Sequence, residues 1–161
     1  MEQMENLKRC CFTGHRPEKL NISGDEVKIR LKKAILQAIE DGFTVFISGM
    51  ARGVDMWAAE IVLEIRETNK DIKLMCVSPF KGFEKSWKAE ERLKYMNIIN
   101  QADYVKFIFE RYSRMCFQIR NRFMVDNSER VIAAYNGESG GTRNTVLYAK
   151  DNDVETVNIL I

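Results

Sequence analysis

The 161-residue chain lacks several features that would assign it to a protein class at once. No apolar run approaches the roughly 20 residues that a membrane-spanning helix needs, and the start MEQMENLKR does not have the form of a signal peptide. We therefore expect a cytoplasmic protein with no membrane partner. The formal net charge is only +2, so overall charge gives no indication of nucleic acid. Nucleic acid is expected to be an unlikely partner, although a local basic patch remains open.

The chain is also poor in side chains that bind metals or carry out redox chemistry. Its only histidine is His15, and its four cysteines, Cys10, Cys11, Cys76 and Cys116, have no metal-ligand spacing. The adjacent pair stands at the start of a strand candidate, which is a poor framework for disulfides. We predict four buried apolar thiols and no metal site.

The sequence does contain a regular alternation of short apolar runs and helical patterns. The run FTVFI at 43–47 has the composition of a strand that is buried on both faces. Val27, Leu31 and Ile35 recur at helical spacing before Gly42. The predicted strands cover 9–12, 43–47, 73–79, 104–109, 130–135 and 155–161. Five helices are predicted. The first follows the capping box at 23–26, the second follows SGMARGVD at 48–55, and the other three cover 84–100, 112–126 and 142–152.

Six strands that alternate with five helices predict a single α/β domain over residues 1–161. Such a pattern is typical of a three-layer, doubly wound, mostly parallel sheet with helices on both faces. No linker, repeat or low-complexity segment interrupts it. In such a sheet, ligands bind beyond the carboxyl ends of the strands, at the point where the strand order reverses.

Three loops at that edge are rich in glycine: TGHRP (13–17), SGMARGVD (48–55) and NGESGGT (136–142). Glycine lets the backbone turn sharply and approach a ligand closely, and the free N–H groups of the following helix favour an anion. Three such loops indicate a phosphate-bearing ligand such as a nucleotide. The chain has neither GxGxxG nor a Walker A pattern, which argues against ordinary dinucleotide and P-loop sites.

Candidate ligand-binding residues come from these loops and from the helix at 112–126. His15 is also a candidate general acid or base, because an ordinary histidine pKa of about 6.5 suits either role near neutral pH. Since no partner carboxylate is evident, ligand contact is favoured over proton transfer. The candidates are Thr13, Gly14, His15, Arg16, Ser48, Gly49, Met50, Ala51, Arg52, Gly53, Asp55, Arg120, Asn121, Ser139, Gly140, Gly141 and Thr142.

Each of these groups has a structural alternative. The glycines of the second loop could serve only a tight turn, and Asp55 could cap the following helix. Thr142 could likewise cap the last helix. Residues 120–122 could form a solvated outer face. Trp57 and Trp87 are interpreted as packing residues rather than as stacking platforms.

The blocks TGHRPEKL, ISGMARGVDMWAAE and RNRFMVDNSERVIAAYNGESGGT, in this order, resemble the YpsA-like family. That family belongs to the SLOG superfamily, together with DprA (Smf) and the LOG cytokinin-activating enzymes. The resemblance covers essentially the whole chain. It implies a Rossmann-like domain that binds a nucleotide or a nucleotide-derived ligand, such as ADP-ribose or an NAD derivative, as a sensor or regulatory module. It also implies a possible homo-oligomer, and no cofactor beyond such a ligand.

The resemblance leaves two alternative functions open. LOG enzymes cleave an N-glycosidic bond and carry a PGGxGTxxE block. The aligned stretch of this chain reads ESGGTRNT. Glu138 replaces the proline of the block, and Thr145 stands at its acidic position. A hydrolase of nucleotide N-glycosidic or phosphate bonds would depend on His15 with Asp55 or Glu60. DprA-like binding of single-stranded DNA would use a strip formed by Arg16, Arg52, Arg120 and Arg122. A ligand-binding protein is favoured over a hydrolase.

Overall fold

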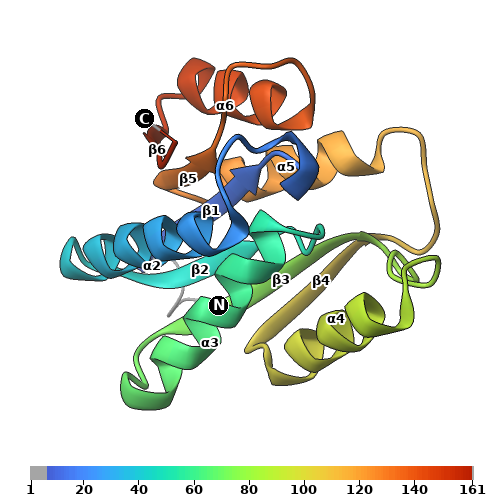
Figure 1. Cartoon of the computed structure of the whole chain (residues 1–161), viewed down its shortest axis with the longest axis horizontal. Coiled ribbons are helices and arrows are strands. Elements are labelled where there is room, and N and C mark those ends of the chain that lie inside the picture. The colour runs from blue at the N-terminus through green and yellow to red at the C-terminus, as the bar shows by residue number, and fades with distance from the viewer. Residues whose placement is uncertain (1–6, 161) are drawn as a thin grey trace.

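A computed structural model of the protein describes residues 7–160, which form a parallel sheet flanked by helices (Figure 1). Within this range the strand order is β4-β3-β2-β1-β5-β6. The strands are β1 (Lys8–Gly14), β2 (Phe43–Ser48), β3 (Lys73–Phe80), β4 (Tyr104–Phe109), β5 (Arg130–Ala134) and β6 (Glu155–Asn158). The helices are the 3-10 helix η1 (Pro17–Lys19), α2 (Gly24–Glu40), α3 (Val54–Thr68), α4 (Ala89–Gln101), α5 (Cys116–Asp126) and α6 (Gly141–Asp151).

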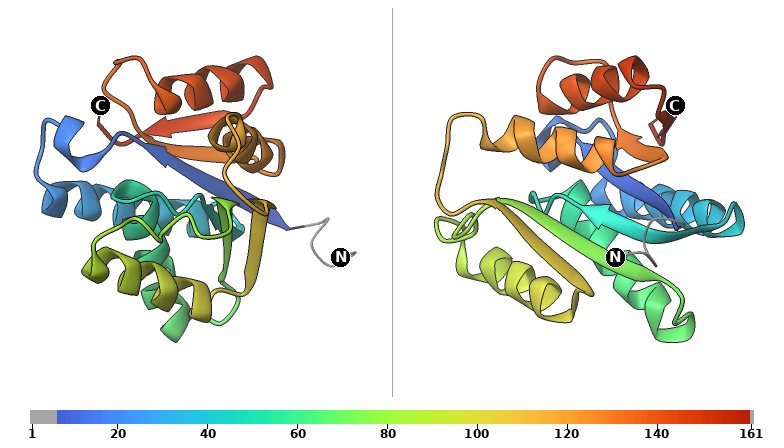
Figure 2. Two further views of the ribbon diagram at one scale, coloured as in Figure 1. Left: turned by 90° about the vertical axis from the view of Figure 1, so that its right-hand side faces the viewer. Right: turned by 180° about the vertical axis from the view of Figure 1, so that it is seen from behind.

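Helices cover both faces of the sheet (Figure 2), so the expected three-layer, doubly wound α/β fold is confirmed. One core lies between the sheet and α2, α3 and α4, and the other lies between the sheet and α5 and α6. The central strand β1 contributes to both, because successive side chains of a strand point to opposite faces. Cys10 and Phe12 enter the first core, and Cys11 enters the second. All four cysteines are free and buried, as predicted.

Two helices begin later than the sequence pattern predicts. The predicted helix at 84–100 begins at Ala89, because turns at 81–86 with Gly82 at φ +85° precede it. The predicted helix at 112–126 begins at Cys116, after a turn in which Cys116 N donates to Ser113 O. Trp87 therefore stands in a loop. Because α4 and α5 begin later than predicted, the loops that follow β3 and β4 are longer than predicted.

Part of the sequence-based analysis falls outside the described residues. The expectation for the start MEQMENLKR concerns mostly residues 1–6, and the last predicted strand includes residue 161, whereas β6 ends at Asn158. The single domain over 1–161 stays a prediction. Among the helices of residues 7–160, none is both long enough and apolar enough to cross a membrane.

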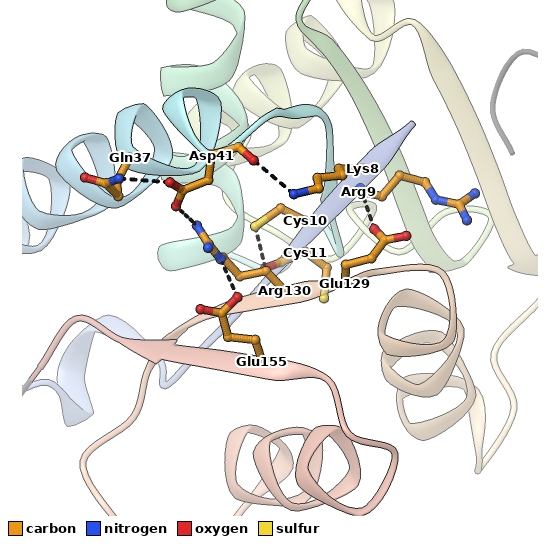
Figure 3. A network of polar contacts seen from close by, with 9 residues as sticks. All are labelled: Lys8, Arg9, Cys10, Cys11, Gln37, Asp41, Glu129, Arg130 and Glu155. Carbon is orange, nitrogen blue, oxygen red and sulfur yellow. Dashed lines mark hydrogen bonds and ion pairs between the residues drawn. The ribbon is translucent and has the colours of Figure 1, made fainter. Parts of the chain in front are cut away.

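Ion pairs join several elements at the amino-terminal edge of the sheet (Figure 3). Arg130 Nη1 lies 2.9 Å from Asp41 Oδ2 after α2, and its Nε lies 3.0 Å from Glu155 Oε2 on β6. The guanidinium also stacks 4.6 Å from the Phe43 ring centroid. The hydrogen bond from Arg130 is the main cause that lowers the pKa of Asp41. Arg130 on β5 thus pairs with a carboxylate at the end of α2 and with one on β6. We call this set of ion pairs the clamp and assign it a structural role, because it connects α2, β5 and β6.

Candidate functional site

A cleft of about 870 Å³ lies at the opposite edge, beyond the carboxyl ends of the strands. It is lined by the loops after β1, β2 and β5, by the segment before α4 and by α5. Its volume falls in the range that small-molecule sites occupy. Because β1 pairs with β2 on one side and with β5 on the other, the cleft lies at the switch point of the strand order. A smaller hollow of about 390 Å³ near Ile22 and Tyr135 has no charged side chain in its lining.

Most of the residues predicted from the sequence line this cleft. They are Thr13, Gly14, His15, Arg16, Ala51, Arg52, Gly53, Asp55, Arg120, Asn121, Ser139, Gly140, Gly141 and Thr142. Ser48, Gly49 and Met50 do not line it, because they are buried beneath the second loop. Ser48 Oγ donates to Asp55 O over 2.8 Å and accepts from Met50 N over 3.2 Å. These three residues support the loop from below.

Two helices begin at the cleft with glycine as the N-cap. Gly53 precedes α3 and Gly140 precedes α6, and within the described chain no side chain caps either helix. The first N–H groups of a helix have no partner within it, and they attract anions when no side chain satisfies them. The alternative in which Asp55 and Thr142 cap these helices is therefore wrong, because each of them stands second in its helix. Met56 N donates to Ala51 O over 3.3 Å, so at the start of α3 the amides left for a ligand are those of residues 53–55.

The first two loops contact each other so closely that side chains would not fit. A Cβ on Gly14 would lie 2.6–2.8 Å from the Val54 side chain, and a Cβ on Gly53 would lie 2.7 Å from Pro17 Cδ. Gly53 also has a φ of +91°, which L residues rarely adopt. These glycines let the loops after β1 and β2 form one continuous wall.

His15 lies in this wall with only 6% of its surface exposed. Its backbone N donates to Ala134 O over 3.2 Å, and its ring stands 5.6 Å from the Tyr135 ring. Burial is the largest cause that lowers its pKa, while Glu138 opposes the shift. Among residues 7–160 its Nε2 has no hydrogen-bond partner. A neutral imidazole with an unsatisfied nitrogen is suited to accept or donate one hydrogen bond to a ligand.

Asp55 and Arg120 form a buried polar centre at the floor of the cleft. Arg120 is 6% exposed, and its guanidinium donates to Gly49 O and to Asn121 Oδ1. Burial raises the pKa of Asp55 to about 6, although the nearby Arg120 and a hydrogen bond from Ala51 N oppose this shift. The alternative of a solvated outer face is wrong for Arg120. This centre offers a fixed cation and a carboxyl group that changes charge near neutral pH.

Several lining residues were missed at the sequence level. They are mainly Lys19, Phe83, Lys88, Glu91 and Phe117, with Trp87 identified only as a packing residue. Position could have found Phe83, Trp87 and Lys88, because the segment 81–88 follows the carboxyl end of β3 and so reaches the ligand edge. It lacks the pattern of glycines that marks the other three loops.

Comparisons with known proteins agree with this architecture. The YpsA family model, described as YspA SLOG family, matches residues 10–159. A UPF0398 protein of Bacillus thuringiensis (strain Al Hakam) is 33% identical over 161 residues, which cover 94% of this chain and 87% of that protein. A UPF0398 protein of Brevibacillus brevis is 32% identical over 145 residues, which cover 84% of this chain and 77% of that protein.

Two solved structures share the fold. DNA processing protein A (DprA) from Streptococcus pneumoniae has a TM-score of 0.65 at 20% identity, and the match covers 96% of this chain and 50% of that one. DprA from Helicobacter pylori, described with a unique single-stranded DNA binding mode, has a TM-score of 0.68 at 19% identity. That match covers 97% of this chain and 66% of the H. pylori chain.

This finding corrects one expectation and establishes the family. Nucleic acid was expected to be an unlikely partner, whereas both structural neighbours are DNA processing proteins. The expectation failed because net charge sums the whole surface, while the cleft itself gathers Arg16, Lys19, Arg52 and Lys88. The family match over residues 10–159 and the similarity to the UPF0398 proteins show that the chain belongs to the YpsA SLOG family.

Proposed function

We propose that the cleft binds a nucleotide through its phosphate. The nucleotide is either a free ligand, such as a nucleotide, ADP-ribose or an NAD derivative, or a unit of single-stranded DNA. One observation carries the proposal: the starts of α3 and α6, which no side chain caps in the described chain, lie at the same cleft that His15 lines, and the buried Nε2 of His15 has no hydrogen-bond partner among residues 7–160. Such amides and an imidazole nitrogen are the groups that bind phosphate oxygens.

The charges of the cleft support an anionic ligand. Arg16, Lys19, Arg52 and Lys88 add exposed cations to the buried guanidinium of Arg120. Three carboxylates also line the cleft, among them Asp55, whose raised pKa lets it take up a proton when an anion binds beside it. Charge-assisted hydrogen bonds from arginine to phosphate are stronger than neutral ones.

The chemistry of the site supports binding more than turnover. General acid–base catalysis needs a proton donor and acceptor within reach of one reacting bond. His15 has a lowered pKa, and among residues 7–160 its Nε2 makes no hydrogen bond, so Glu138 is near enough to oppose the pKa shift but does not hold the Nε2 of the imidazole. We therefore favour a sensor or regulatory module whose occupied state is read by a partner or by a second copy of the chain.

Single-stranded DNA is favoured as a source of the nucleotide by the likeness to two DNA processing proteins. A strand would bind through the same phosphate contacts, with several units along the cleft. Its affinity would fall steeply with salt, because each neutralised phosphate releases counterions. The two sources are therefore distinguished by chain length and by salt dependence.

The test compares the binding of AMP, ADP-ribose, NAD and a fluorescein-labelled 12-mer of thymidylate at 50 and 200 mM salt. Arg16→Gln removes a cation of the cleft, and Lys150→Gln, on the exposed surface of the last turn of α6 and outside the lining, is the control. Loss of one charge-assisted hydrogen bond should weaken binding by about tenfold or more. Binding of none of the four probes, or equal losses in the two variants, would overturn the proposal.

A further inference from the structure

Aromatic side chains form a ledge at one end of the cleft. We define the aromatic ledge as Phe83, Trp87, Tyr112 and Phe117. Phe83 lies 5.0 Å from Trp87 and 5.7 Å from Phe117, and Tyr112 lies 6.4 Å from Phe117, measured between ring centroids. The rings cross at 60–72°, so they pack edge to face. This geometry fixes the rings relative to one another.

Much of the ledge is exposed to solvent, with Phe83, Trp87 and Phe117 at the cleft and Tyr112 beside it. Tyr112 is 63% exposed and Phe117 is 40% exposed, while Phe83 and Trp87 are half-buried. Phe83, Trp87 and Phe117 all line the cleft. Trp87 also packs edge to face on the buried Tyr95, which agrees with the packing role predicted from the sequence. Packing explains why the ledge is rigid, but it does not explain the apolar surface left in the cleft.

Cations stand on this surface. Arg52 Cζ lies 5.7 Å from the Trp87 ring centroid, and Arg120 Cζ lies 5.9 Å from the Phe117 ring centroid. These are two of the cations that the proposed function assigns to phosphate. The cleft thus combines aromatic ring faces with adjacent positive charge. A nucleotide has the matching pair of groups, a flat base and an anionic phosphate.

We infer that the aromatic ledge binds a nucleobase by stacking, and this inference rests on the proposed function. The ledge follows β3 and β4, whereas α6 begins after β5. The ends of β3 and β5 are three strand spacings apart, about 14 Å at about 4.8 Å per strand. The stacked base therefore belongs to a phosphate held near Arg52 at the start of α3. A base–aromatic stack is tolerant of base identity, because every base has a π face.

The test uses AMP and ribose 5-phosphate, which differ only by the base. The chain has two tryptophans, so Trp57→Phe leaves Trp87 as the only indole fluorophore. In that variant AMP should change the Trp87 emission and ribose 5-phosphate should not. Removal of one stacking ring is worth about 1–3 kcal/mol, so Phe117→Ala should weaken AMP binding on the order of tenfold and leave ribose 5-phosphate binding unchanged.

Tyr104→Ala is the matched control, because Tyr104 is an exposed aromatic on β4 outside the cleft lining. It should alter neither ligand's affinity, and circular dichroism should show that both variants fold. Equal affinities for AMP and ribose 5-phosphate, with no effect of Phe117→Ala, would overturn base stacking on the aromatic ledge. The proposal of phosphate binding would then remain intact. If a 12-mer of thymidylate quenches the Trp87 emission while AMP does not, the stacked base belongs to a DNA strand. That result supports base stacking on the aromatic ledge. Failure of all three probes to bind overturns both proposals.

Discussion

Gly53→Ala tests how the first two loops of the cleft are joined. Gly53 has a φ of +91° and a ψ of −125°, a conformation that alanine strongly disfavours. Its new methyl group would also lie 2.7 Å from Pro17 Cδ and 2.8 Å from Pro17 Cγ. Since a proline ring cannot rotate away, the loop at 13–17 must move. The substitution therefore combines backbone strain with overpacking.

The expected loss in the free energy of unfolding is the sum of these two contributions. A residue in a sparsely populated backbone region costs about 1–3 kcal/mol, and overpacking costs about 1–3 kcal/mol more. Gly140→Ala carries only the first cost, because its φ is +140° and no atom lies within 4 Å of the added methyl group. Gly141→Ala carries neither cost, since its nearest neighbour is Asn121 Nδ2 at 3.9 Å. Because Gly141 is the first residue of α6, its gain should be smaller than the roughly 0.5–1 kcal/mol of a mid-helix glycine replaced by alanine.

Urea unfolding followed by circular dichroism measures all three variants. The free energy of unfolding should fall most in Gly53→Ala, less in Gly140→Ala, and remain unchanged or rise in Gly141→Ala. Because the three are compared with one another, errors of extrapolation to zero urea largely cancel. If Gly53→Ala were as stable as Gly141→Ala, the close contact between the loops after β1 and β2 would be refuted.

Three further predictions concern charge and thiol chemistry. A bound anion repels the Asp55 carboxylate, whose pKa is about 6, so protonation of Asp55 should favour AMP binding as pH falls from 7 to 5. Because His15 and the AMP phosphate (second pKa about 6) also titrate, calorimetry compares the unsubstituted protein with Asp55→Asn, in which the affinity for AMP should gain less as pH falls, and identical pH profiles would contradict the assignment. Arg130→Met should return the lowered pKa of Asp41 towards its ordinary value, as followed by carboxyl NMR, and no change would exclude the clamp as its cause. The four buried thiols should resist a thiol reagent in the folded protein and react on unfolding, whereas rapid reaction when folded would contradict their burial.

The sequence predicted the fold well because hydrophobic periodicity and loop composition are local signals. The alternation of strands and helices placed β2, β4 and α6 within a residue or two of their observed ends. Strand order is not a local property, so the sheet order had to come from the structure. Helix starts were misplaced where a turn carries an apolar residue, as Trp87 does at 84–88, because side-chain periodicity does not report backbone hydrogen bonds.

The candidate site was predicted where glycine marked it and, on α5, at Arg120 and Asn121. The glycine loops brought together His15, Arg52 and Gly140 as expected. The aromatic ledge was not predicted, because a tryptophan or phenylalanine in a loop has the same pattern whether it packs or faces a cleft. The buried state of Arg120 was also missed, since its burial depends on the approach of the loop at 48–55 to α5.

Backbone amide NMR during titration with AMP tests the central claim most directly. Binding of phosphate at the starts of α3 and α6 should shift the amide resonances of residues 53–55 and 140–142 most strongly. The amides around Arg130 and Glu155, at the opposite edge of the sheet, should not move. If saturating AMP leaves the amides of both helix starts unshifted, or shifts chiefly the residues around the smaller hollow at 135–137, the account is contradicted.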